Sequence, residues 1–219
     1  IEENEKGWNK YFTGSREIFI KPIEICTFNL LRLIIYFKFG LKFNINEIKK
    51  FILNIYTQQF KSNNKSKIIS ILRSQGKHEM MDKIEKNTIN LENLIFSEDY
   101  YITDLDILAC CEGIKAINKP NKNYVLKIVL YSENNFKTIN SNINWICLDK
   151  PETKFSENKY FFIKVPSEIL VNKPMSYSLI ENSFSFFDNE YIDTSDNMKK
   201  HIEKNIYTFD SLLNSYILK

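Results

Sequence analysis

The chain has 219 residues, of which 43% are hydrophobic and 14% aromatic, so it carries enough apolar surface to bury a core. With only five Gly and five Pro, the composition excludes a collagen-like repeat and an intrinsically disordered chain. Its 30 basic residues nearly balance 27 acidic ones. That balance is well short of the strongly basic composition typical of nucleic-acid-binding proteins.

The basic residues are almost all lysine, since arginine occurs only at Arg16, Arg32 and Arg73. Ile, Lys, Asn, Phe and Tyr dominate the chain, and all five have AT-rich codons. We therefore interpret the composition as the product of an AT-rich genome. The abundance of lysine is then partly a codon effect.

Four cysteines, Cys26, Cys110, Cys111 and Cys147, lie in apolar runs without the C-x-x-C spacing of a metal or redox site. They are predicted to be buried free thiols of a protein in a reducing intracellular compartment. No signal peptide is visible, and the first residue is Ile1 rather than Met, so we expect a fragment, a processed product or the ordered part of a longer protein.

The first hundred residues are predicted to be helical. The most apolar stretch, 28–43, is shorter than the roughly 20 apolar residues of a membrane span, so it predicts a buried helix ending at Gly40. The next helix would begin at Asn44 or Asn46, followed by helices over about 67–74, 78–86 and 90–97. Thr103 and Asp106 have the spacing of a capping box at the start of a further helix.

The second half is rich in short β-prone runs at 124–131, 145–148, 160–165 and 177–180, which predict strands of one small sheet. Helices are expected over 196–207 and 209–218. The prediction is therefore an α+β protein, with a helical N-terminal half followed by a small mixed or antiparallel sheet flanked by helices. The expected division is a helical subdomain over 1–98 and a sheet-containing subdomain over 99–219, joined as one unit.

Few residues fit a catalytic template. The five glycines are too far apart for a phosphate-binding loop, and the histidines His78 and His201 both lie in polar segments. Asp104 and Asp106 are expected to cap a helix rather than to bind a metal. The sequence thus predicts no cofactor and no metal site.

One part of the chain has a family resemblance. It contains, in order, LRSQGK (72–77), YYITDLDILA (100–109), KIVLYS (127–132), WICL (145–148), KYFFIKVP (159–166) and YSLI (177–180). This order resembles a C-terminal region of very large uncharacterised proteins from mimivirus-like giant DNA viruses, and it covers about half of the chain. The resemblance implies a viral parent protein, located in the host cytoplasm or the virion.

The segment 105–111, the strand 128–130 and the strand that begins at 160 more loosely resemble the late part of OTU-type cysteine proteases. In that family a catalytic His precedes the final strand, whereas this chain has Lys159 there. The Asp-Gly-x-Cys nucleophile motif is also absent, and Cys26 lies in IEICT. The resemblance therefore implies an inactive, binding version of the fold.

Three functions follow as hypotheses. The first is a non-enzymatic structural or protein-interaction domain that binds other protein subunits. The second is a cysteine hydrolase of ubiquitin-like or peptide substrates, in which Cys26 works with His78 or His201. The third, which is not favoured, is a nucleic-acid-binding module that uses lysine-rich helix faces. Its candidate residues are Lys61, Lys65, Lys67, Lys199, Lys200 and Lys204.

Overall fold

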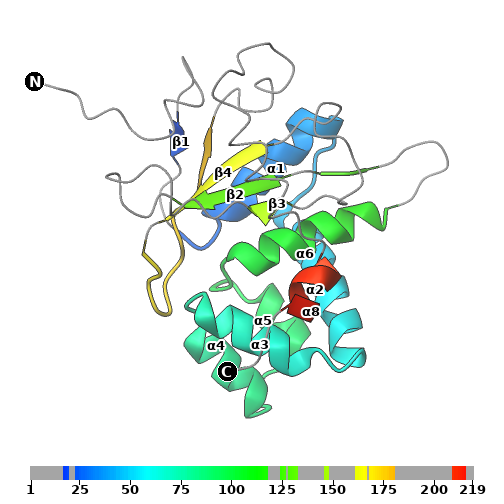
Figure 1. Ribbon diagram of the computed structural model, residues 1–219, viewed down its shortest axis with the longest axis vertical. Helices are drawn as coiled ribbons and strands as arrows, with labels where there is room; N and C mark the ends of the chain where they lie inside the picture. Colours follow the sequence, from blue (N-terminus) through cyan, green and yellow to red (C-terminus); the bar gives the residue numbers. More distant parts are fainter. Residues whose placement is uncertain are drawn as a thin grey trace, which may run out of the picture. The chain divides into compact units, whose positions relative to one another are not determined.

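The computed structural model describes residues 17–19, 23–117, 124–126, 128–132, 146–147, 161–166, 168–180 and 209–215. Backbone contacts divide the chain into two compact units. We call residues 1–19, 127–167 and 177–208 the sheet unit, and residues 20–126, 168–176 and 209–219 the helical unit. After the short strand β1 (Glu17–Phe19), helices make up the described N-terminal half and further strands follow them, so the predicted α+β class is confirmed (Figure 1).

The helical unit begins with α1 (Cys26–Phe39), α2 (Ile45–Lys61) and α3 (Lys65–Ser74). Gly40 ends α1 in the left-handed conformation, at a φ of 67°, as predicted. Asn44 and Glu47 form a reciprocal capping box at the start of α2, which confirms the first of the two predicted caps. The second half of α1 departs from the predicted buried helix, because Tyr36 and Phe37 are about half exposed.

The chain continues through α4 (His78–Glu85), α5 (Leu91–Phe96) and α6 (Asp104–Lys115). Thr103 and Asp106 form the predicted capping box at the start of α6. Helix α6 packs along α2, and almost all of its side chains from Leu105 to Ile114 are buried. The boundary expected between residues 98 and 99 lies between α5 and α6, yet both helices are in the helical unit because both pack against α2.

Two later segments return to the helical unit. One is the loop 168–176, and the other is α8 (Phe209–Ser215), which packs against α6. The Gln59 side chain donates a hydrogen bond to the Asp210 carboxylate at 2.8 Å, and the rings of Tyr56 and Phe209 lie 6.3 Å apart. Helix α8 matches the start of the helix predicted over 209–218, whereas the helix predicted over 196–207 lies outside the described residues.

The sheet unit contains one mixed sheet in the order β1-β5-β4-β2-β3. Its strands are β1 (Glu17–Phe19), β2 (Ile128–Ser132), β3 (Ile146–Cys147), β4 (Phe161–Val165) and β5 (Ser178–Ile180). Strands β2 and β4 are parallel, and the other pairs are antiparallel. The register aligns Ile128 with Phe161, Leu130 with Ile163, and Ile163 with Leu179, so these buried side chains share one apolar face.

The sequence predicted four of these strands and missed β1, because three residues at a sheet edge carry too little alternation to be recognised. Residues 124–126 were expected to extend β2, but they are not part of a strand and belong to the helical unit. In the part of the chain that the structure describes, no helix is long and apolar enough to cross a membrane.

Candidate functional site

The candidate nucleophile Cys26 is the first residue of α1 and is 3% exposed. Its Sγ atom lies 3.5 Å from the Thr27 hydroxyl oxygen and 3.9 Å from the Met175 carbonyl oxygen. His78 begins α4 with an exposed side chain. Within the described residues, Cys26 and His78 do not hydrogen-bond, as a nucleophile and its base must, and His201 lies outside those residues.

The candidate lysines lie where α2 ends and α3 begins. Lys61 is exposed at the end of α2, whereas Lys65 and Lys67 are half-buried on α3. The Lys65 ammonium lies 5.8 Å from the centre of the Phe60 ring. Lys199, Lys200 and Lys204 lie outside the described residues. The structure therefore describes only the first of the two lysine groups.

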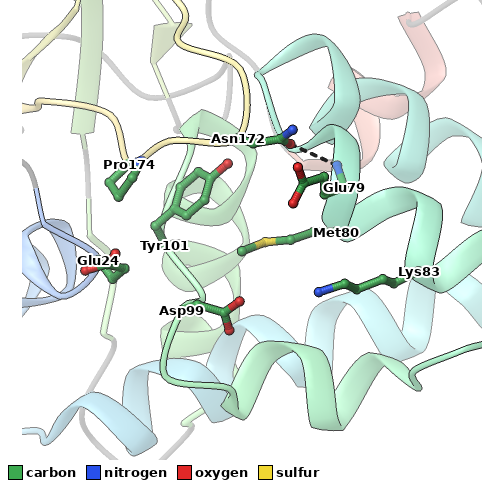
Figure 2. Close-up of a pocket in the computed structure, with 8 residues that line it drawn as sticks. All are labelled: Glu24, Glu79, Met80, Lys83, Asp99, Tyr101, Asn172 and Pro174. Carbon is green, nitrogen blue, oxygen red and sulfur yellow. Dashed lines mark hydrogen bonds between the residues drawn. The ribbon is translucent and has the colours of Figure 1, made fainter.

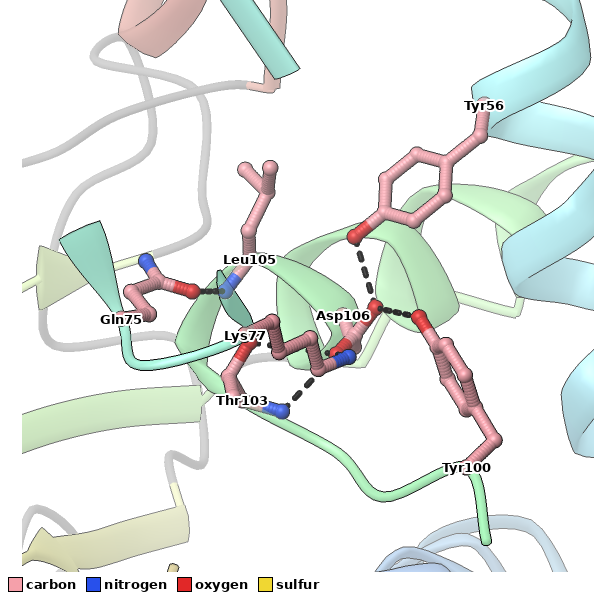
Figure 3. A network of polar contacts seen from close by, with 7 residues as sticks. All are labelled: Tyr56, Gln75, Lys77, Tyr100, Thr103, Leu105 and Asp106. Carbon is pink, nitrogen blue, oxygen red and sulfur yellow. Dashed lines mark hydrogen bonds and ion pairs between the residues drawn. The ribbon is translucent and has the colours of Figure 1, made fainter. Parts of the chain in front are cut away.

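Among the described residues of the helical unit, the Asp106 carboxylate accepts several hydrogen bonds and is fully buried (Figure 3). Its Oδ1 accepts hydrogen bonds from the hydroxyls of Tyr56 and Tyr100, at 2.7 and 2.6 Å. Its Oδ2 pairs with the Lys77 ammonium at 2.5 Å and accepts from the Thr103 backbone N–H at 2.8 Å. These contacts tie α2, the turn before α4 and the start of α6 to one carboxylate. We call these five residues the Asp106 network.

Burial is the largest cause of the pKa shifts in this network. It lowers the pKa of Lys77, although the neighbouring Asp106 carboxylate opposes that shift. It also raises the pKa of Tyr56 and Tyr100 well above the usual value, and Asp106 adds to both shifts. Lys77 and Asp106 are 0% exposed, so the network is closed to a substrate and serves to hold the helices together.

Tyr101 differs from its neighbour Tyr100. Its side chain is 4% exposed, and its buried hydroxyl has no hydrogen-bond partner among the described residues. Such a hydroxyl costs free energy unless water or a ligand satisfies it. Burial, followed by the charges of Asp106 and Glu79, raises the pKa of Tyr101 to about 12. The phenol is therefore neutral near pH 7 and offers both an O–H donor and an oxygen acceptor.

The loop 168–176 is fixed to the turn between α3 and α4. The Asn172 backbone N–H donates to the Gly76 carbonyl at 2.8 Å, and its side chain accepts from the Glu79 backbone N–H at 2.9 Å. Gly76 has a φ of 98°, and a Cβ there would lie 2.7 Å from the Leu170 carbonyl oxygen. Only glycine allows the loop to approach this closely.

A pocket of about 120 Å³ lies within the helical unit, between this loop, α4 and the segment before α6 (Figure 2). The Tyr101 ring is part of its wall, and Figure 2 shows the hydroxyl directed toward Asn172 and Glu79. The other side chains that line it are Glu24, Met80, Lys83, Asp99 and Pro174. We call this the Tyr101 pocket.

Three carboxylates (Glu24, Glu79 and Asp99) and one ammonium (Lys83) line the pocket, which leaves an excess of negative charge. All four side chains are exposed, and none of them has a hydrogen bond or ion pair within the described part of the chain. Among the described residues, no three acidic, His or Cys side chains converge closely enough to hold a metal ion. The pocket thus offers separate acceptors around its rim rather than a coordination centre.

Sequence reasoning identified Asp106 only as a helix cap, and it missed Lys77, Tyr56, Tyr100 and the whole Tyr101 pocket. The available signal was YYITDLD at 100–106, which places two tyrosines and two acids within seven residues. That signal says nothing about the loop 168–176, which reaches the pocket only through the tertiary fold. Comparison with protein-family models, with curated proteins and with solved structures finds no match to the chain.

Proposed function

We propose that this chain is a non-enzymatic protein-interaction domain, and that the loop 168–176 is its contact surface. One observation carries the proposal. Ile169, Leu170 and Val171 are consecutive in sequence, and their exposed fractions are 52%, 49% and 55%. Large aliphatic side chains exposed in a row are unfavourable in water, at about 25 cal/mol per Å² of apolar area, unless a partner covers them.

The anchoring of the loop supports this role. Asn172 and Gly76 hold its backbone against the turn before α4, so the aliphatic side chains cannot simply fold back onto the helices. A preorganised loop also loses little conformational entropy when it binds. The viral parent protein suggested by the sequence belongs to the same proposal, as a large assembly in which such a domain would bind other subunits.

The test is an affinity purification of the tagged parent protein, with partners quantified by mass spectrometry. We would compare the native chain with the triple variant Ile169→Ser, Leu170→Ser, Val171→Ser. The matched control is Tyr36→Ser with Phe37→Ser, because these two residues are also exposed but lie on α1. We expect the triple variant to lose its stoichiometric partners and the control to keep them.

Retention of every partner by a folded triple variant would overturn the proposal. Equal losses in both variants would also overturn it, because they would reflect general surface hydrophobicity rather than this loop. Circular dichroism should show the same helix content in all three proteins, since the substituted side chains are exposed.

A further inference from the structure

We propose that the Tyr101 pocket binds the cationic side chain of a lysine or arginine presented by a partner protein. The inference rests on the proposed function and names the chemistry that the interaction surface recognises. It begins with the Tyr101 hydroxyl, which is buried, faces the pocket and has no partner in the described structure. A native protein satisfies nearly all such groups, so this hydroxyl points to a polar ligand.

The charge of the pocket selects the ligand. Glu24, Glu79 and Asp99 outnumber the single cation Lys83, so an anion would be repelled and a cation attracted. The neutral Tyr101 oxygen can accept a hydrogen bond from an ammonium or guanidinium group, as can the carboxylates around it. Because the carboxylates do not converge on one point, they suit a group with several N–H donors better than a metal ion.

The size of the pocket limits the ligand further. Its volume of about 120 Å³ is below the roughly 300–1,000 Å³ of typical small-molecule sites, so it suits a single side chain. The Met80 side chain, which is 8% exposed, and Pro174 supply apolar wall for the aliphatic part of such a side chain.

The surroundings favour a protein over a free amine. Ile169, Leu170 and Val171 immediately precede Asn172, and the exposed Ile23 and Ile25 flank Glu24. Exposed apolar side chains are thus sequence neighbours of two residues that line the acidic pocket. A partner protein can bury them with the neighbours of its lysine or arginine, whereas a free polyamine has no comparable apolar surface. Arginine at the centre of an apolar patch is also a common interface anchor.

The experiment is a ¹H–¹⁵N NMR titration of the full chain with Nα-acetyl-lysine amide and Nα-acetyl-arginine amide, which both keep a cationic side chain. The uncharged control is Nα-acetyl-norleucine amide, which keeps the four-carbon aliphatic chain of lysine and lacks its ammonium group. We expect saturable shifts with the two cationic probes at the amides of Glu79, Lys83, Asp99 and Tyr101. The norleucine probe should give at least tenfold weaker binding.

Three variants sharpen the result. Glu79→Gln with Asp99→Asn should reduce cation affinity at least tenfold, and Lys83→Gln should increase it, because the Lys83 ammonium in the pocket wall repels a cationic ligand. The matched control Glu92→Gln with Glu98→Gln removes two exposed carboxylates that do not line the pocket and should leave the affinity unchanged.

The inference would be overturned by no saturable shift with either cationic probe, by equal binding of norleucine amide, or by unchanged affinity in the Glu79 and Asp99 variant. Tighter binding of free spermidine than of both amino-acid amides would also overturn it, in favour of a free amine ligand. These outcomes are independent of the affinity purification. Loss of partners in the triple loop variant combined with no cation binding would leave the interaction proposal standing and reject only this one.

Discussion

Tyr100 and Tyr101 are neighbours in the sequence, and both side chains are buried, yet their hydroxyls lie in opposite environments. The Tyr100 hydroxyl donates to Asp106 inside a network in which each polar group has a partner. The Tyr101 hydroxyl reaches a pocket whose carboxylates are exposed and unpaired within the described residues. The contrast separates polar groups that stabilise the fold from polar groups available for binding.

The largest expected difference is between two acids. Asp106→Asn should lower the free energy of unfolding by about 3–5 kcal/mol, because it leaves the buried Lys77 ammonium without its counter-charge. Asp99→Asn should have little effect, since Asp99 is exposed at the pocket rim. Urea denaturation of both variants measures the difference. Equal destabilisation would contradict the distinction between the Asp106 network and the Tyr101 pocket.

Tyr100→Phe and Tyr101→Phe are a more closely matched pair of variants, because each removes one buried tyrosine hydroxyl. Tyr100→Phe should cost about 1.5–3 kcal/mol, because Asp106 loses a hydrogen bond to a charged group. Tyr101→Phe should leave stability unchanged or slightly increased, because it removes a hydroxyl that has no partner. Thermal and urea unfolding of the pair would check this. A loss in Tyr101→Phe as large as that in Tyr100→Phe would show that its hydroxyl is already satisfied.

Two glycines test how the pocket is built. Gly76→Ala should cost more than about 1 kcal/mol, because the residue has a positive φ and its new methyl group would collide with the Leu170 carbonyl. Gly40→Ala is the control: its φ is also positive, at 67°, but a Cβ there meets nothing within 4 Å. Urea denaturation should show a larger loss in the free energy of unfolding for Gly76→Ala than for Gly40→Ala.

Hydrogen exchange would locate the effect of these substitutions. We expect Gly76→Ala to increase exchange at the Asn172 amide, which is bonded to the Gly76 carbonyl. Unchanged protection of that amide would show that the loop 168–176 does not depend on the close approach to Gly76.

The last expected effect is in alkaline stability. Tyr101 has a pKa of about 12 in the folded protein, above the value near 10 in the unfolded chain. Its contribution to the free energy of unfolding is therefore complete below pH 10 and is lost as the pH rises through 12. Tyr56 and Tyr100 act in the same direction. Unfolding measured from pH 9 to 12 should therefore show stability falling above pH 10. In Tyr101→Phe the slope should be shallower by at most about 1.4 kcal/mol per pH unit.

Much of the fold could be predicted because its signals are local. The caps at Gly40 and at Thr103 with Asp106 are defined within a few residues and occur as predicted, and Asn44 is the one of the two predicted caps that begins α2. The β-prone runs identified four strands, although β1 was too short to be recognised. The predicted boundary between residues 98 and 99 follows the change from helical to β-prone sequence. In the structure, α6, the loop 168–176 and α8 all belong to the helical unit, although they follow that boundary in the chain.

The sequence by itself determined the α+β class, the helix ends and the apolar character of α6, because each depends on neighbouring residues. Only the tertiary structure decided that Asp106 meets Lys77 and Tyr56, which lie 29 and 50 residues away in the chain. It also decided that Asn172 binds near Glu79, which lies 93 residues before it. The reason is physical: a carboxylate that caps a helix and one that pairs with a buried lysine have the same local sequence. Their burial, partners and charge are fixed only when distant segments pack together.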